Sequence, residues 1–563
     1  MTSEASVPSS RPAASGTWWP GVLALVVLTV GAGVTGLSNG FTYDDIPIIA
    51  TNPRVHTLEA PWVIFAQRYW PAGHPALLYR PLGILLFALE WQAGGGRPFL
   101  YHVVNLLLAA AVTVAVYALA RRLLPRWPAW AAAALFAVHP VHVEVTANVV
   151  GQLELIVALL LCLGVAMYLR WRGVGNDDGS GLAGPIPERR IAGLAAVYAA
   201  ACLVKDNAIV LPALLLLAEW LLVRDDRPPA ARIRSLLPAY AALATVGMLY
   251  LAVRTIVTGK LGGDIALRWL LEASFRGRVC TMLAIVPEWA RLLLWPERLG
   301  ALYGPPGLPV LESMSAKSWL GLALVAGVAL AFVAALRRDR RVSFALAWLG
   351  ITLLPVSNIL VISGVFLGER TLFLPSVGFV LLIGVAVEWL LDRAGAFRPA
   401  RVALVTALAA LVLLGAGRSL ERHPVWRDNA TLFAQSVLDT PESYTAWWNH
   451  GSALFAAGKP GSGEAAMRRA MALYDRNPFL FEELADQYFK AGLCPQALPL
   501  YRRTIELEPG HWWTRLKAID CLVATGDSAG ARREAEAGLA VGRHADEFRR
   551  ALALLNGATP DAR

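Results

Sequence analysis

Long apolar runs separated by short polar gaps fill residues 17–420, and a polar stretch follows from 421 to 563. About 20 consecutive apolar residues are enough to cross a bilayer as a helix. The segment 79–91 is too short for this and is expected to lie along the membrane interface. The pattern predicts an all-α membrane bundle of about eleven spans, at 17–38, 99–120, 128–143, 149–169, 191–204, 208–223, 235–257, 318–336, 342–362, 371–391 and 402–418.

Arginine clusters in the gaps predict which side of the membrane each loop occupies, because cytoplasmic loops are enriched in Lys and Arg. They place residues 1–16 in the cytoplasm, and the loop 39–98 and the polar tail together outside. A span at 279–295 would reverse this pattern, so we expect an interfacial or re-entrant helix there. The clusters lie at 121–126, 170–172, 189–190, 224–234, 337–341 and 393–401.

The polar tail repeats with the 34-residue period of tetratricopeptide (TPR) repeats. Small residue–glycine pairs recur at that spacing, at 457–458, 491–492 and 525–526. We therefore predict a soluble α-solenoid of about three TPR repeats in 421–563, whose concave face could hold a peptide.

Composition agrees with a membrane protein, since only 16% of the 563 residues are charged, against about 25% in soluble proteins. The net charge of +10 would suit nucleic acid, but the arginines lie between apolar runs and no nucleic-acid partner is expected. The five cysteines show no metal-ligand spacing. Cys494 and Cys521 could pair only if the fold brings them together.

The acidic pair Asp44 and Asp45 directly follows the first span, so it lies just outside the membrane. A solvated pair that caps a short helix is the ordinary interpretation of two adjacent acids. At the mouth of a helical bundle, however, a partly shielded carboxylate is suited to take a proton from a hydroxyl while a lipid-borne donor arrives from the bilayer. We therefore treat both acids as candidate bases.

Three cations on the predicted outer face, Arg80, Lys205 and Arg370, are candidates to bind the phosphate of such a donor. Snorkelling to lipid headgroups is the alternative role for each of them. Ion pairing with a sequence neighbour, Asp206 beside Lys205 or Glu369 beside Arg370, is another. Both acids are predicted to line the same polar cavity.

The motif His139-x-x-His142-x-Glu144 has the residue types of a metal site. Pro140 interrupts it, and no further ligand is near in sequence, so we expect these three side chains to line the cavity and predict no bound metal or other cofactor. The chain has no glycine-rich phosphate loop, which agrees with a sugar already attached to a lipid.

Several blocks in order along the chain resemble the transmembrane-and-TPR O-mannosyltransferases (the TMTC family) and their bacterial relatives, within the GT-C glycosyltransferases. The most specific block is 135–144 with 150–154 (Val-Gly-Gln-Leu-Glu) after it. The others are 41–45 (Phe-Thr-Tyr-Asp-Asp), 79–82, 101–108, 205–206, 355–358, 369–376 and 426–429 (Trp-Arg-Asp-Asn).

The resemblance implies a GT-C fold and transfer of a mannose-like sugar, with inversion, from a polyprenyl phosphate to a protein hydroxyl. It makes Asp44 or Asp45 the base and Arg80, Lys205 and Arg370 the phosphate ligands. Relatives often have Glu at the position of Asp206 and Arg at the position of Gln152. The repeat array of this chain is also short. The implied location is the bacterial cytoplasmic (inner) membrane with a periplasmic array. A membrane-anchored TPR scaffold and a transporter of lipid-linked sugars are the competing functions.

Overall fold

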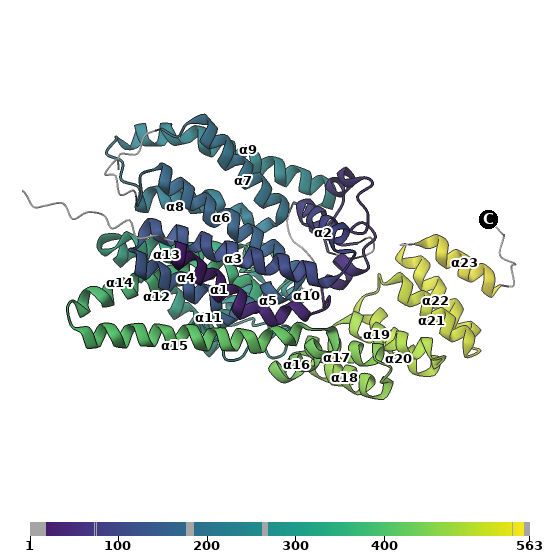
Figure 1. Ribbon diagram of the computed structural model, residues 1–563. Coiled ribbons are helices and arrows are strands. Elements are labelled where there is room, and N and C mark those ends of the chain that lie inside the picture. The colour runs from purple at the N-terminus through teal and green to yellow at the C-terminus, as the bar shows by residue number, and fades with distance from the viewer. Residues whose placement is uncertain are drawn as a thin grey trace, which may run out of the picture.

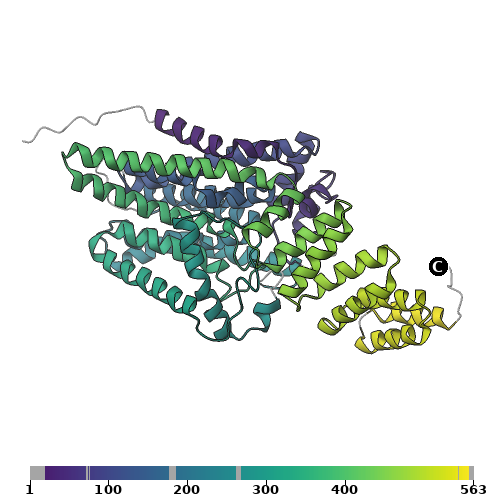
Figure 2. The ribbon, with the colours of Figure 1, turned by 90° about the horizontal axis from the view of Figure 1, so that it is seen from below.

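The computed structural model describes residues 19–71, 74, 76–175, 185–261, 268–542 and 544–556. Within these residues the chain is helical, and apart from an isolated bridge between Pro306 and Ser443 they contain no strand. This confirms the predicted all-α class. Helices α1–α15 form a bundle, and α16–α23 form a second group that extends from one end of it (Figures 1 and 2).

Most bundle helices are long and antiparallel to a neighbour, and several begin with a proline, which suits a first turn because its N–H has no helical partner. They are α1 (Trp19–Gly33), α2 (Pro81–Gly94), α3 (Pro98–Leu123), α4 (Arg126–Val138), α5 (Val143–Ala147), α6 (Gln152–Trp171), α7 (Glu188–Val204), α8 (Leu211–Leu222), α9 (Pro229–Thr258), α10 (Arg268–Glu272), α11 (Phe275–Leu294), α12 (Ala316–Arg338), α13 (Arg340–Leu353), α14 (Phe373–Ala394) and α15 (Arg398–Arg422).

Short 3-10 and π turns join these helices and carry much of the polar chemistry at one end of the bundle. They are η1 (Val34–Ser38), η2 (Ile46–Ala50), η3 (Pro61–Ala66), η4 (Pro140–His142), η5 (Val149–Gly151), η6 (Asp206–Val210), η7 (Leu354–Val356), η8 (Glu369–Leu372) and η9 (His423–Trp426).

Seven helical stretches in the described part of the chain are long and apolar enough to cross a membrane. They correspond to seven of the predicted spans: Trp19–Ser38, Pro98–Leu123, Val149–Trp171, Pro229–Thr258, Ala316–Arg338, Glu369–Ala394 and Arg398–Trp426. The other four predicted spans, 128–143, 191–204, 208–223 and 342–362, contain the shorter helices α4, α7, α8 and α13, of 12 to 17 residues. The count of eleven is therefore not confirmed.

A large apolar cluster that α3, α4, α6, α8 and α14 all enter forms most of the bundle core, and a second, smaller cluster lies around α11. Bulky rings such as Tyr101, Phe136 and Trp348 are almost fully buried in the bundle. Helices α13 and α14 pack so closely that a Cβ at Gly378 would lie 2.5 Å from the carbonyl oxygen of Ala345. A core packed to this density fixes the helix ends, and the polar turns between them, in defined positions.

The tail consists of helical hairpins that repeat every 34 residues, as the sequence predicts. Each hairpin turns at a glycine with positive φ, namely Gly458, Gly492 and Gly526, which have φ of 71°, 72° and 82°. A disulfide between Cys494 and Cys521 joins α20 to α21. The helices of this array are α16 (Asn429–Asp439), α17 (Tyr444–Ala456), α18 (Pro460–Leu473), α19 (Pro478–Lys490), α20 (Cys494–Leu507), α21 (Trp512–Ala524), α22 (Ser528–Val541) and α23 (Ala545–Leu555).

The array is docked to the bundle at the end that carries the Asp44 loop (Figure 1). The Tyr444 N–H donates to the Pro305 carbonyl oxygen at 3.1 Å, and the Thr440 hydroxyl donates to the Leu302 carbonyl oxygen at 3.0 Å. An apolar cluster that includes Val143, Leu302, Trp426, Leu432 and Phe433 closes the junction. The loop with the acidic pair and the repeat array therefore lie together.

Candidate active site

Asp45 ties the first outer loop to the start of α6. Its side chain is fully buried and accepts backbone N–H bonds from Thr42 (3.2 Å), Val149 (3.2 Å) and Val150 (2.9 Å). Burial raises the pKa of Asp45 to about 7, and these N–H donors act in the opposite direction. Both carboxylate oxygens are occupied by the backbone, which favours Asp44 over Asp45 as the acid that meets a substrate.

Asp44 lies against Arg370, at the start of the turn that leads into α14. Its Oδ2 is 3.1 Å from Nη1 of Arg370, and the two side chains are 17% and 24% exposed. Glu144 contacts the same arginine, with Oε1 3.5 Å from Nε and Oε2 accepting the Arg370 backbone N–H at 2.8 Å. One guanidinium thus serves two carboxylates, and Asp44 is the more exposed of the two.

Lys205 ends α7 and points to the first turn of α6, where its ammonium donates to Glu154. The Asn207 amide donates to the other oxygen of the same carboxylate at 3.1 Å. Glu154 is therefore held between two donors from the segment that joins α7 to α8. Its side chain is only 6% exposed, whereas that of Lys205 is 16% exposed.

Arg80 precedes α2 and lies over the ring of Tyr69, with 5.0 Å between the guanidinium carbon and the ring centroid. Its Nη2 is 3.6 Å from Oδ2 of Asp206. The other oxygen of Asp206 is 3.5 Å from Nε of Arg254 and accepts the hydroxyl of Tyr250. This part of the site is built from the first outer loop, the α7–α8 turn and the end of α9.

The three predicted phosphate ligands lie in one electrostatic neighbourhood. Burial lowers the pKa of Lys205 to about 8; Glu154 opposes this, and the positive charges of Arg80 and Arg370 lower the pKa further. Like charges perturb one another in this way only at short range. Arg80 pairs with Asp206, which directly follows Lys205, so the fold brings these two cations together, and Arg370 acts on Lys205 electrostatically.

Sequence reasoning missed several members of this cluster. Glu154 is the last residue of the block 150–154, which resembles the TMTC family. That resemblance could have indicated a role for this acid. Arg254 lies within the predicted span 235–257, and a charged residue inside an apolar run is a recognised sign of function. Tyr250, one helical turn earlier on the same helix, carries no comparable signal.

Ion pairing with a sequence neighbour was an alternative role for Lys205 and Arg370, and the described residues show other partners for both cations. Within the described residues, Lys205 pairs with Glu154 and Arg370 pairs with Asp44 and Glu144. Glu369 turns away from Arg370, accepting the Tyr303 hydroxyl at 3.0 Å and the backbone N–H of Gly300. Adjacent residues in a 3-10 turn point in different directions, which explains the separation of Glu369 from its neighbour.

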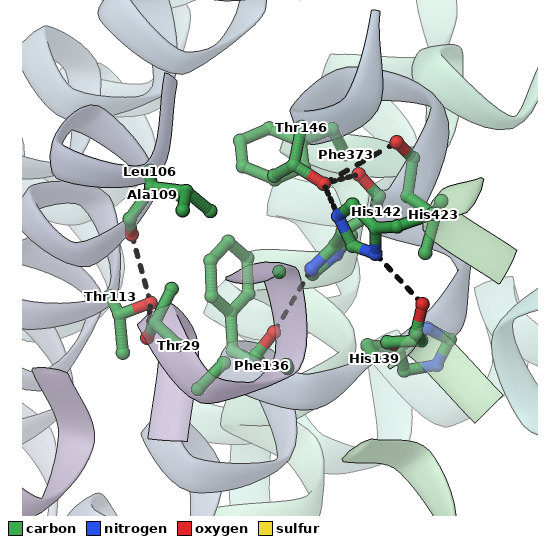
Figure 3. A pocket seen from close by; sticks show the side chains of 15 residues that line it. Thr29, Leu106, Ala109, Thr113, Phe136, His139, His142, Thr146, Phe373 and His423 are labelled. Carbon is green, nitrogen blue, oxygen red and sulfur yellow. Dashed lines mark hydrogen bonds between the residues drawn. The ribbon is translucent and has the colours of Figure 1, made fainter. Parts of the chain in front are cut away.

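His139 and His142 line a small cavity, of about 20 Å³, between α1, α3, α4, α14 and α15 (Figure 3). Each ring is held by hydrogen bonds: His139 by the Leu293 carbonyl oxygen at 3.0 Å, and His142 by the Phe136 carbonyl oxygen and the Ser376 hydroxyl, both at 2.9 Å. Whether the two histidines line the cavity that receives the donor stays a prediction.

Glu144 is not among the residues that line this small cavity, and its predicted place in the polar cavity of the site stays a prediction. The residue follows η4 on α5 and faces Arg370 instead. The break at Pro140 separates the directions of the three side chains. Across the described residues, no three His, Cys, Asp or Glu side chains are grouped in an arrangement that could hold a metal ion.

Comparison with known proteins gives no match to any protein-family model. The chain is 28% identical over 520 residues to protein O-mannosyl-transferase Tmtc1 of Drosophila melanogaster, covering 77% of this chain and 59% of that protein. It is 26% identical over 486 residues to human protein O-mannosyl-transferase TMTC1, covering 78% and 54%. Its homologues are protein O-mannosyl-transferases of the TMTC type. The resemblance drawn from the sequence blocks is therefore confirmed.

The chain spans about half the length of the curated relatives it matches. Among solved structures, the apo oligosaccharyltransferase of Archaeoglobus fulgidus superposes with a TM-score of 0.40 and 14% identity, covering 72% of this chain and 56% of that chain.

Proposed function

We propose that this protein is a membrane glycosyltransferase that moves a mannose-like sugar from a polyprenyl phosphate to a hydroxyl of a protein, with inversion at the anomeric carbon. The observation that carries the proposal is the cluster in which Asp44 lies beside Arg370, with Lys205 and Arg80 in the same neighbourhood. The TMTC-type homologues support the same reaction class.

In this mechanism the donor phosphate binds among the three cations. A sugar–phosphate diester carries one negative charge, and the departing lipid phosphate carries two near neutral pH. The charge that develops on the leaving oxygen is met by Arg80, Lys205 and Arg370, which are already in place and partly shielded from water. The cluster is therefore better matched to the transition state than to the bound donor.

Arg370 also links donor binding to the base. In the resting site its Nη1 is bonded to Asp44. A phosphate that takes over this N–H group releases Asp44, while Glu144 keeps Arg370 in place through one contact with the guanidinium and one with the backbone N–H. Asp44 then accepts the proton of the acceptor hydroxyl. At the same time the hydroxyl oxygen of the acceptor bonds to the anomeric carbon, and the bond between that carbon and the phosphate oxygen breaks.

The acceptor polypeptide is proposed to approach from the side of the array. A cavity of about 300 Å³ lies between α10 of the bundle and the array helices. Its lining mixes both signs of charge with an aromatic ring, which suits a polar peptide. The lining residues are Glu272, Tyr474, Asp475, Arg476, Arg503 and Leu507.

The array is proposed to lie outside the cytoplasm, on the periplasmic side of a bacterial inner membrane. The Cys494–Cys521 disulfide supports this, since such bonds persist in oxidising compartments. Helix α6 supports the same orientation, because it starts at the site and ends at Arg170, in one of the basic clusters predicted to be cytoplasmic.

Purified protein in lipid nanodiscs, incubated with a panel of polyprenyl-phosphate sugars and an acceptor-peptide library, tests the proposal. We expect glycopeptide and free polyprenyl phosphate to form together, and Asp44→Asn to abolish both. Asp546→Asn, which changes an exposed acid of α23, is the matched control and keeps full activity. In sealed proteoliposomes, donor that crosses the bilayer unconsumed would indicate a transporter, and no handling of donor in either preparation would indicate a scaffold.

A further inference from the structure

Two of the sequence blocks lie in contact, although about 380 residues separate them along the chain. Residues 41–45 carry the acidic pair, and residues 426–429 lead into the array. The Gly40 N–H donates to the Arg427 carbonyl oxygen at 2.8 Å. The Tyr43 N–H donates to Oδ1 of Asn429 at 2.7 Å. The loop that holds Asp44 is thus hydrogen-bonded to the entrance of the array.

Tyr43, the residue directly before Asp44, is in a backbone conformation that needs external support. Its φ is 51°, in the left-handed region that residues with a Cβ rarely adopt. Its ring packs edge-to-face on Phe433 of α16, with 6.0 Å between centroids. Burial raises the pKa of the Tyr43 hydroxyl, and Asp44 and Arg370 lie close enough to affect it as well.

Helix α16 is itself firmly placed, so it can hold a strained neighbour. Asp428 caps its N-terminus by accepting the Thr431 N–H at 2.8 Å. Trp426 is 2% exposed and packs in the apolar cluster at the junction with the bundle. Backbone strain at a functional site persists only where the surroundings enforce it, and here α16 supplies that support.

We propose that Asn429 and Phe433 are positioning residues that hold Tyr43 in its left-handed conformation and thereby aim Asp44 at the reacting hydroxyl. The inference rests on the proposed role of Asp44 as base. It makes the first helix of the array a part of the catalytic centre, in addition to any role the repeats have in binding the acceptor. Transfer then depends on an intact bundle–array junction even when donor and acceptor bind normally.

The test compares four variants of the whole chain in nanodiscs, three of them at asparagines and the fourth Phe433→Leu. Asn429→Ala removes the oxygen that accepts the Tyr43 N–H, whereas Asn429→Asp keeps one. Asn449→Ala is the matched control, since this asparagine of α17 donates to the Thr445 carbonyl oxygen of its own helix. Hydrogen–deuterium exchange at the Tyr43 amide reports the bond directly and needs no turnover. Steady-state kinetics with donor and acceptor report the consequence.

We expect Asn429→Ala to speed exchange at the Tyr43 amide about tenfold, and to lower kcat about tenfold or more with donor KM within about twofold. Asn429→Asp should restore most of both, and Asn449→Ala should change neither. Phe433→Leu, which keeps the hydrogen bond and removes the ring contact, should lower kcat without loss of folded protein.

Three results would overturn the inference: unchanged exchange in Asn429→Ala, faster exchange with unchanged kcat, or an equal loss of kcat in Asn449→Ala. The proposed function fails separately, if the unaltered protein transfers no sugar from any donor. In that event the exchange rate at Tyr43 alone decides whether the hydrogen bond to the array holds the loop.

Discussion

Replacing Asp44 and Asp45 with asparagine, one at a time, should separate chemistry from structure. Asp45→Asn changes a buried carboxylate that accepts three backbone N–H bonds. Its amide has one oxygen and directs an NH2 group at a backbone N–H, which leaves at least one buried donor unpaired. An unpaired buried donor costs about 1–3 kcal/mol, and weaker bonds to a neutral acceptor add to this. We expect a loss of about 2–4 kcal/mol of stability.

Asp44→Asn should behave differently, because Asp44 makes a partly exposed ion pair and Arg370 keeps its contacts with Glu144. Exposed or partly exposed pairs contribute about 0–1 kcal/mol, so the folded protein should be nearly as stable as before. Loss of a general base, however, lowers a rate by about 10²–10⁴-fold. The variant should bind donor normally and turn it over at least about a hundredfold more slowly.

The assay pairs a thermal melt of each purified variant in detergent with sugar transfer at saturating donor. Asp44→Asn should melt close to the parent protein and be inactive, whereas Asp45→Asn should melt several degrees lower. A stable, inactive Asp45→Asn together with an active Asp44→Asn would refute the assignment of the two acids. So would two stable and fully active variants, which would remove both acids from the mechanism.

Further predictions follow from other contacts. Lys205, with its pKa lowered to about 8, is cationic below that pH and neutral above it, so kcat/KM for the donor should fall as the pH rises past 8; Lys205→Arg, measured over the same range, should lack this fall because arginine stays charged. Replacing Cys494 and Cys521 with serine opens a loop closed across 27 residues and should destabilise the array by about 3 kcal/mol. The melting temperature should therefore fall, and adding reductant to the parent protein should lower it by the same amount. Gly151→Ala would place a Cβ 2.1 Å from the Val145 carbonyl oxygen, so it should disrupt the start of α6 and lower the yield of folded protein; equal yields would contradict the close packing there.

The general architecture was predictable from the sequence because it depends on local periodicity. The apolar runs indicated the long helices, and glycines spaced by 34 residues indicated the hairpin turns that the structure shows at Gly458, Gly492 and Gly526. The span count was less predictable. Helices such as α8 have only 12 residues, and an apolar run does not by itself show whether a helix crosses the membrane.

The candidate site was predictable as a set of residues but not as a set of contacts. The blocks along the chain named Asp44, Arg80, Lys205 and Arg370, whereas only the fold shows that Arg370 bridges Asp44 and Glu144. It likewise shows that Asp45 is occupied by backbone N–H groups. Adjacent acids look equivalent in a sequence, and only the direction of each side chain distinguishes them.

Residue types and their spacing determined that this chain forms membrane helices followed by helical hairpins, since both properties depend on neighbours a few positions apart. Packing over hundreds of residues decided which charges meet. The Lys205 ammonium donates to Glu154, and the Tyr43 N–H donates to Asn429, because helices far apart in sequence pack side by side. Such pairings minimise the cost of burying charge and backbone polar groups in the whole molecule, a quantity that no local stretch of sequence contains.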